Sequence, residues 1–214
     1  MAHLLIHRGL AKKKFSENTI SAFKYCFKKN YGIETDIHCT KDNKIVCFHD
    51  FNLNGKFKVN KFIKKTNYQE LLKISKINKK PIPQLKDLIK LSKKKRFLML
   101  EIKPFFSKEN LKVLLAELKG LKNYCLTSFK EKNIINLYKI RKNLNLGLLI
   151  PSTFTFKKVL QNSKKKHIKF LVLEKKFLYE KKLNKLKKKV YFYTIRDKII
   201  FNKFKNKNLI FENL

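Results

Sequence analysis

The segment Gly32–Asp50, GIETDIHCTKDNKIVCFHD, constrains the fold more than any other part of the chain. Its first apolar run contains two carboxylates two residues apart. Because side chains alternate faces along a strand, Glu34 and Asp36 point the same way. Placing two acids on an otherwise buried face costs on the order of several kcal/mol unless cations or a metal compensate. The chain must therefore bring positive charge to this strand.

The second half of the same segment predicts a β-hairpin. Asp42 and Asn43 suit the left-handed backbone of a tight loop, and a second apolar run follows them. A loop of these two residues places His49 opposite Asp36, whereas a three-residue loop places it opposite Thr35. We expect the two-residue loop, because it puts the imidazole on the face that carries the acids.

Two other short apolar runs end in charged residues. The first run of the chain leads into His7 and Arg8, and a later one ends in Glu101, Ile102 and Lys103. Barrels and open α/β folds keep their functional residues at strand ends. We therefore expect these residues to meet the acids of the hairpin segment.

A series of short motifs runs through the first half of the chain in the order His7-Arg8-Gly9, Glu17-Asn18-Thr19, Ala22-Phe23, Gly32-Ile33-Glu34-Thr35-Asp36, Thr40-Lys41-Asp42, His49-Asp50 and Glu101-Ile102-Lys103. In order and spacing the series resembles the glycerophosphodiester phosphodiesterase family, whose barrel is of the phosphatidylinositol-phospholipase-C-like type. The match is dense over residues 3–103 and thinner afterwards. The resemblance implies hydrolysis of glycerophosphodiesters, such as deacylated phospholipid head groups, to glycerol 3-phosphate and an alcohol.

Apolar runs alternate with amphipathic segments along the whole chain, which is typical of repeated βα units. We predict barrel strands at 3–6, 32–38, 96–102, 123–128, 146–150, 169–173, 189–195 and 208–212, and a hairpin strand at 45–48. We predict helices at 19–30 with Asn18 as N-cap, 68–74, 84–93, 108–118, 130–143, 155–166, 178–188 and 198–206. The order predicts an α/β fold, a (βα)8 TIM barrel with a hairpin extension after the second strand.

We expect residues 1–214 to form one barrel domain in which residues 51–82 are a short covering segment. The last predicted strand lies at the end of the sequence, so we expect the final helix of the barrel to be missing or truncated. Side chains, a partner subunit or a shifted neighbouring element would then cover that flank.

The acids predict a metal site. Glu34, Asp36 and Glu101 offer only oxygen ligands, which suits one hard divalent cation, Mg²⁺ or Ca²⁺. Such a cation would neutralise a phosphodiester oxygen. Arg8 and Lys103 would supply further positive charge as the transition state forms.

The resemblance implies that His7 and His49 are the general acid and base. It leaves open which is which, and whether water or a neighbouring glycerol hydroxyl attacks the phosphorus. Tyr193 stands where the family usually has Trp, so we expect it to form an aromatic wall for the glycerol moiety. We interpret Asn18 as a helix cap rather than a ligand.

The chain carries 53 Lys and Arg against 15 Asp and Glu, a formal charge of +38. Lysine is spread along nearly every predicted helix, together with much Asn, Ile and Phe, a pattern typical of genome-wide compositional bias. We therefore expect the partner to be a small glycerophosphodiester, not nucleic acid. Peripheral contact with an anionic membrane, and a homo-oligomer through the flank without a final helix, stay open.

No N-terminal signal peptide can be drawn, because the first apolar run leads directly into His7, and no apolar run approaches the ~20 residues of a membrane span. The four cysteines have no CxxC spacing. We expect a cytoplasmic protein.

Two alternatives remain. One is a lysophospholipid phosphodiesterase of the same fold. The other is a catalytically idle basic barrel that binds nucleic acid or anionic lipid, and the acids and imidazoles together argue against it.

Overall fold

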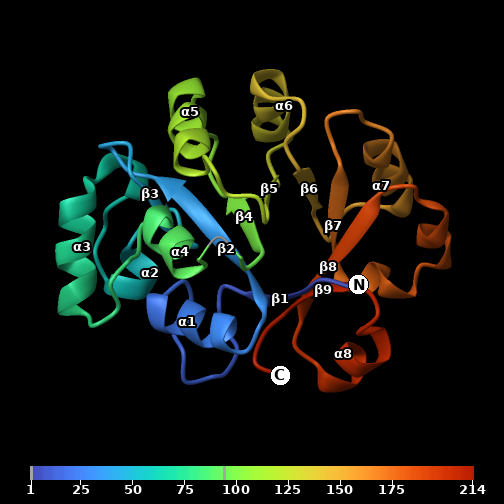
Figure 1. The fold of residues 1–214 in the computed structure, drawn as a ribbon, viewed down its shortest axis with the longest axis horizontal. Coiled ribbons are helices and arrows are strands. Elements are labelled where there is room, and N and C mark those ends of the chain that lie inside the picture. Colours follow the sequence, from blue (N-terminus) through green and yellow to red (C-terminus); the bar gives the residue numbers. More distant parts are fainter. Residues whose placement is uncertain (1, 94) are drawn as a thin grey trace.

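The computed structural model describes residues 2–93 and 95–214, which form a nine-stranded sheet closed into a barrel (Figure 1). Strand β1 pairs in parallel with both β2 and β9, and this closes the sheet. The barrel strands are β1 (Leu4–His7), β2 (Gly32–Cys39), β4 (Leu98–Ile102), β5 (Tyr124–Ser128), β6 (Leu146–Ile150), β7 (Phe170–Glu174), β8 (Lys189–Ile195) and β9 (Asn208–Phe211). The predicted (βα)8 barrel is confirmed.

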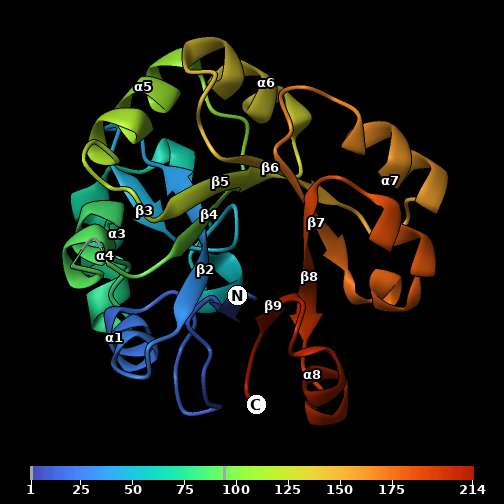
Figure 2. The same cartoon turned by 45° about the vertical axis from the view of Figure 1, so that its right-hand side comes forward.

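The helices lie around the outside of the strands (Figure 2). They are α1 (Ile20–Lys28), α2 (Asn54–Phe57), α3 (Tyr68–Ile77), α4 (Leu85–Leu91), α5 (Lys108–Glu117), α6 (Glu131–Ile140), α7 (Phe156–Ser163) and α8 (Lys198–Phe204). Short 3₁₀ helices occupy Ile63–Lys65, Lys175–Tyr179 and Lys181–Lys185. Within the described residues, no helix is long and apolar enough to cross a bilayer.

The apolar residues form two cores on the two faces of the barrel wall. On β4, Leu98, Leu100 and Ile102 belong to the large outer core that packs against the helices, whereas Met99 belongs to a small inner core. The inner core contains Leu5, Met99, Cys125, Leu149, Phe170, Val172, Tyr191 and Ile210. The side chains thus alternate along this strand, and the alternation sends Glu101 to the inner face.

Gly147 makes room for the inner core. A Cβ atom at this position would lie 2.2 Å from Cε2 of Phe170 on the neighbouring strand. We expect Gly147→Ala to lower the free energy of unfolding by about 1–3 kcal/mol, because the ring of Phe170 has to shift within the packed inner core. Thermal unfolding followed by circular dichroism would show a loss of about 2–4 °C for each kcal/mol.

Gly55→Ala is the control, because the nearest atom to its added Cβ is Asp50 Oδ2 at 3.3 Å. Equal melting temperatures for the two variants would contradict the packing argument.

The predicted helix at 178–188 is wrong. Two 3₁₀ helices, Lys175–Tyr179 and Lys181–Lys185, occupy this region. Glu174 and Glu180 each accept a hydrogen bond from the backbone N–H two residues further on. These local side-chain turns compete with α-helical pairing, and the apolar spacing does not reveal them.

The hairpin has a three-residue loop, so the predicted two-residue loop is wrong. Strand β3 (Ile45–Cys47) runs antiparallel to β2 with Ile45 opposite Cys39, and the N–H of Thr40 donates to the carbonyl of Lys44 at 2.9 Å. Asn43 alone of the two predicted loop residues has a positive φ, 56°. Continuing this register places His49 opposite Thr35, beyond the end of β3.

Residues 51–82 lie beside the hairpin, where Figure 1 shows α2 and α3 next to β3. They form a third core with Val46 and Phe48 of the hairpin, to which they contribute Leu53, Phe57, Ile63, Tyr68, Leu71 and Ile82. This hairpin core holds the outer edge of β3, where the N–H of Cys47 also donates to the carbonyl of Pro83 at 2.9 Å. The segment thus supports the strand that leads to His49.

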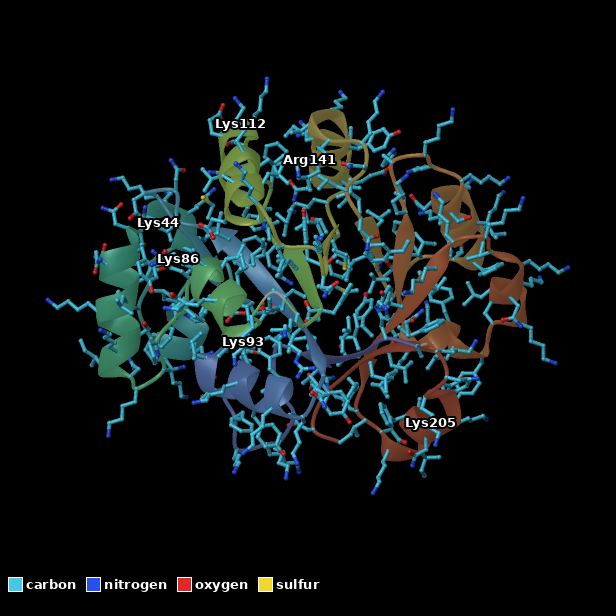
Figure 3. All side chains as sticks on the ribbon, in the orientation of Figure 1. Lys44, Lys86, Lys93, Lys112, Arg141 and Lys205 are labelled. Atoms are coloured by element: carbon cyan, nitrogen blue, oxygen red, sulfur yellow. The ribbon has the colours of Figure 1, made fainter. Side chains whose placement is uncertain are left out.

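The basic side chains point outward on many sides of the molecule (Figure 3). The labelled Lys44, Lys86, Lys112, Arg141 and Lys205 come from the hairpin, α4, α5 and the segments after α6 and α8. In this view the positive charge is dispersed over the outer surface and does not gather on one element. This distribution agrees with the compositional interpretation.

Candidate active site

A cavity of about 250 Å³ opens at the carboxyl ends of the barrel strands. Every predicted site residue except Asp36 lines it, namely His7, Arg8, Glu34, His49, Glu101, Lys103 and Tyr193. The strand register explains the convergence, because His7 pairs with Glu34 and Asp36 pairs with Glu101. No residue of the 51–82 segment is among the lining residues.

The predicted acids lie together, with Glu34 and Glu101 lining this cavity and Asp36 buried beside them. Glu34, Asp36 and Glu101 each have a carboxylate oxygen within 4.8 Å of the others. All are buried, with Asp36 only 1% exposed. A cluster of oxygen ligands with this spacing can hold one hard divalent cation.

Two cations contact these acids. Nε of Arg8 lies 3.2 Å from Oδ2 of Asp36, and its Nη1 donates to Glu17 at 2.8 Å. Nζ of Lys103 lies 3.4 Å from Oδ1 of Asp36 and 2.9 Å from Oε1 of Glu101. Burial raises the pKa of Asp36, but Arg8 and Lys103 outweigh it and hold that pKa below its ordinary value.

The other two acids lack sufficient compensation. Burial raises the pKa of Glu34 well above its ordinary value, and Asp36 and Glu101 raise it further. Burial and Asp36 raise the pKa of Glu101 to about 7, despite the ion pair with Lys103. Three buried carboxylates face two cationic side chains, so one negative charge is left without a cation, and a bound divalent ion would supply the missing positive charge. The donor set and its charge therefore fit the predicted cofactor.

The two imidazoles come from different parts of the fold. Nε2 of His7, at the end of β1, lies 3.9 Å from Oε2 of Glu34. Burial lowers the pKa of His7, against the opposing effect of its hydrogen bond with Glu212. His49 lies beyond β3, where its Nδ1 is 2.7 Å from Oδ1 of Asp50. The cavity thus has an imidazole from the barrel and another from the hairpin.

His38 supports the position of His49. Its Nε2 lies 3.2 Å from the carbonyl oxygen of His49, and since a carbonyl only accepts, Nε2 is the donor. His38 is 2% exposed, and burial lowers its pKa to about 4. It is therefore a neutral structural residue at neutral pH.

Asn18 is not the cap of α1, which corrects the sequence interpretation. The cap is Thr19, whose hydroxyl accepts from the N–H of Ala22 at 3.4 Å. Asn18 is buried with a φ of 54°, and its amide bridges two residues of β2. Its Nδ2 donates to Asp36 at 3.2 Å and its Oδ1 accepts from the hydroxyl of Thr35 at 2.7 Å. It fixes the orientation of Asp36.

Tyr193 presents its ring rather than its hydroxyl to the cavity. The hydroxyl donates to the carbonyl of Ile150 at 3.1 Å, and burial raises its pKa to about 12. The ring packs edge-on against Phe129, with 6.1 Å between centroids. Phe129, which the sequence did not predict as a site residue, also lines the cavity.

Sequence reasoning also missed Glu212 and Arg196. Glu212 follows β9 and contacts Nδ1 of His7, while Nε of Arg196 donates to its Oε1 at 2.6 Å. An acid directly after the last barrel strand is the signal that would have found it, because site residues gather at carboxyl ends of strands.

Known proteins resemble this chain in sequence and in fold. A model of the glycerophosphoryl diester phosphodiesterase family matches residues 7–208. The Bacillus subtilis (strain 168) protein YhdW is 30% identical over 158 residues, which are 70% of this chain and 63% of YhdW. The chain thus spans less than two thirds of the length of this curated relative.

Two solved structures share the fold. A glycerophosphodiester phosphodiesterase from Thermotoga maritima has a TM-score of 0.83 at 23% identity, covering 100% of this chain and 95% of that one. An Oleispira antarctica phosphodiesterase in complex with its product sn-glycerol-3-phosphate has a TM-score of 0.80 at 21% identity, covering 100% of this chain and 93% of that one. At these identities the likeness concerns the fold.

Proposed function

Since the chain belongs to the glycerophosphoryl diester phosphodiesterase family, we propose that it hydrolyses glycerophosphodiesters to glycerol 3-phosphate and an alcohol. The observation that carries this proposal is the convergence of His7, His49 and the acid cluster on one cavity. The product named for the Oleispira antarctica structure, sn-glycerol-3-phosphate, supports the same reaction for this chain.

In the proposed reaction, Glu34, Asp36 and Glu101 hold Mg²⁺ or Ca²⁺, which when bound would neutralise a nonbridging phosphate oxygen. Arg8 and Lys103 keep Asp36 ionised and add positive charge at the phosphate. These residues prepare the phosphodiester for attack by lowering the cost of the charge that develops.

His7 and His49 transfer the protons. One imidazole accepts the proton of the attacking hydroxyl or water, and the other protonates the leaving alkoxide. The two come from different elements, the end of β1 and the segment after β3, so each can carry out one of the two proton transfers. The rings of Tyr193 and Phe129 form an apolar wall for the glycerol moiety.

The test is an assay of the purified protein with glycerophosphocholine in the presence of Mg²⁺ or Ca²⁺. We expect stoichiometric release of glycerol 3-phosphate and choline. The assay is repeated with glycerophosphodiesters of other head groups, including ethanolamine, inositol and glycerol, because the protein could accept only some of them. Absence of glycerol 3-phosphate with every one of these substrates would refute the proposed function.

A second candidate substrate, a lysophospholipid, is favoured by exposed aromatic rings, one of which, Phe129, lines the cavity. Phe51, Phe105 and Phe129 are 49%, 48% and 40% exposed on segments that follow β3, β4 and β5. Nζ of Lys132 lies 5.2 Å from the ring of Phe105, so a cation accompanies this apolar surface. Faster turnover of lysophosphatidylcholine in anionic vesicles than of glycerophosphocholine would favour this substrate.

A further inference from the structure

Glu212 follows β9, and hydrogen bonds hold its backbone between β8 and the loop after β1. The backbone N–H of Glu212 donates to the carbonyl of Ile195 at 3.0 Å, and that of Asn213 donates to the carbonyl of Leu10 at 2.8 Å. The residue is 7% exposed. Its backbone is thus held at the carboxyl end of β8 and beside the loop that follows β1.

Both oxygens of this carboxylate have partners. Oε2 contacts Nδ1 of His7, and Oε1 accepts from Nε of Arg196 at 2.6 Å. Burial raises the pKa of Glu212, but the hydrogen bonds from His7 and Arg196 outweigh it and lower that pKa to about 2. The group is therefore a carboxylate at neutral pH and can only accept hydrogen bonds.

An acceptor at Nδ1 determines where the proton of a neutral His7 lies. Nδ1 must carry the hydrogen, which leaves Nε2 with a free lone pair. Nε2 is the ring nitrogen near Glu34, at 3.9 Å, and the ring lines the cavity. The tautomer that Glu212 selects is the one that presents an unprotonated nitrogen to the substrate side.

We infer that Glu212 is a positioning residue for His7, fixing its ring and tautomer, and that Arg196 holds Glu212 in turn. The inference deepens the proposed function and rests on it for its catalytic consequence. A purely structural link between β9 and β1 is a weaker explanation, because these strands already pair along Leu4, Leu5 and Ile6.

Because Arg196 also contacts Glu212, the variant Glu212→Gln should reverse the tautomer of His7. In Glu212→Gln the guanidinium can only donate, so the amide oxygen faces Arg196 and the amide NH₂ faces His7. Nδ1 must then accept, and the proton moves to Nε2. We expect turnover to fall by about 100-fold or more with little change in KM, because the wrong tautomer is selected.

Removing Arg196 releases the amide. In Glu212→Gln/Arg196→Leu the amide is free to turn its oxygen toward His7, so the original tautomer becomes accessible again. We expect the double variant to recover at least about tenfold in kcat over Glu212→Gln alone, which a structural link would not produce.

Long-range ¹H–¹⁵N spectra of protein with labelled histidines read the tautomer directly, independently of activity. We expect Nδ1–H for His7 in the wild type and the double variant, and Nε2–H in Glu212→Gln. The control is Glu131→Gln. Glu131 lies outside the cavity and likewise joins an imidazole to a cation, with His167 and Lys165 each 2.7 Å from its carboxylate.

The outcomes separate this inference from the proposed function. Nε2–H in the wild type, or an unchanged tautomer in Glu212→Gln, overturns the positioning role even if the protein is an active phosphodiesterase. A reversed tautomer with unchanged kcat overturns its catalytic consequence. If the wild type has no phosphodiesterase activity, the spectra still decide whether Glu212 orients His7. If Glu212→Gln does not fold, the wild-type spectrum alone decides this.

Discussion

Removing divalent cations with EDTA is expected to lower the rate of glycerol 3-phosphate release by about 10³-fold, and added Mg²⁺ or Ca²⁺ is expected to restore it. The physical reason is the charge balance of the cavity, in which Glu34, Asp36 and Glu101 outnumber Arg8 and Lys103. Neutralising developing phosphate charge is worth several kcal/mol, and about 4 kcal/mol corresponds to this factor.

The same experiment has a stability readout that does not depend on activity. A cation at 100 times its Kd stabilises the folded state by about 2.7 kcal/mol. We expect the added cation to raise the melting temperature of the wild type. It should raise that of Asp197→Asn equally, because Asp197 caps α8. Asp36→Asn should lose the gain, because the buried ligand at the centre of the cluster has been neutralised.

The gain should also be larger at pH 8 than at pH 5. Without the cation, Glu101 has a folded-state pKa of about 7 against an ordinary 4.5. The folded protein therefore binds more protons than the unfolded chain between these values, and it loses stability as the pH rises through them. A bound cation requires the carboxylates to be deprotonated, so it reverses this loss. Full activity after chelation, with no thermal shift, would contradict the metal site.

Substituting His49 or His7 by Asn is expected to lower kcat by about 10²–10⁴-fold, the range for a lost general acid or base. His167→Asn is the matched control, since that imidazole also contacts a carboxylate, Glu131 at 2.7 Å, outside the cavity. Initial rates with glycerophosphocholine measure the effect.

The thermal shift with Mg²⁺ or Ca²⁺ separates chemistry from metal loss. His49 is no member of the acid cluster, so His49→Asn should retain the shift while losing turnover. A kcat within threefold of the wild type in either histidine variant would contradict two-imidazole catalysis.

Strand periodicity explains how much of this site could be predicted. Glu34 and Asp36 share a face because they are two residues apart, and Glu101 lies one strand away in direct register with Asp36. The first fact follows from alternation along a strand, which is local in sequence, and the second from the parallel pairing of β2 with β4 in the βα-repeating fold. His7 and His49 were predicted from the ordered sequence motifs.

The hairpin loop depended on contacts that periodicity does not contain. The hydroxyl of Thr40 lies 2.6 Å from Oδ1 of Asp42, and that oxygen also accepts from the N–H of Tyr68 at 2.9 Å. The N–H of Lys44 in turn donates to the hydroxyl of Thr40 at 2.9 Å. A residue 26 positions away thus helps to select the three-residue loop.

Asn18 and Glu212 were mispredicted or missed for a related reason. Each acts through a partner distant in sequence, Asn18 on Asp36 and Glu212 on His7. An asparagine before a helix is ordinarily a cap, and an acid near a terminus is ordinarily solvated. The tertiary fold overrides both expectations.

The two imidazoles are held by different parts of the structure, His7 by the barrel and His49 by the hairpin core. His7 is attached to a closed ring of strands, whereas His49 directly follows Phe48, which packs in the separate cluster that contains Leu53 and Leu71. A local melting of that cluster would displace His49 while the ring persists. Heat would then inactivate the protein below the temperature at which its secondary structure disappears, and cooling would restore turnover without refolding of the barrel.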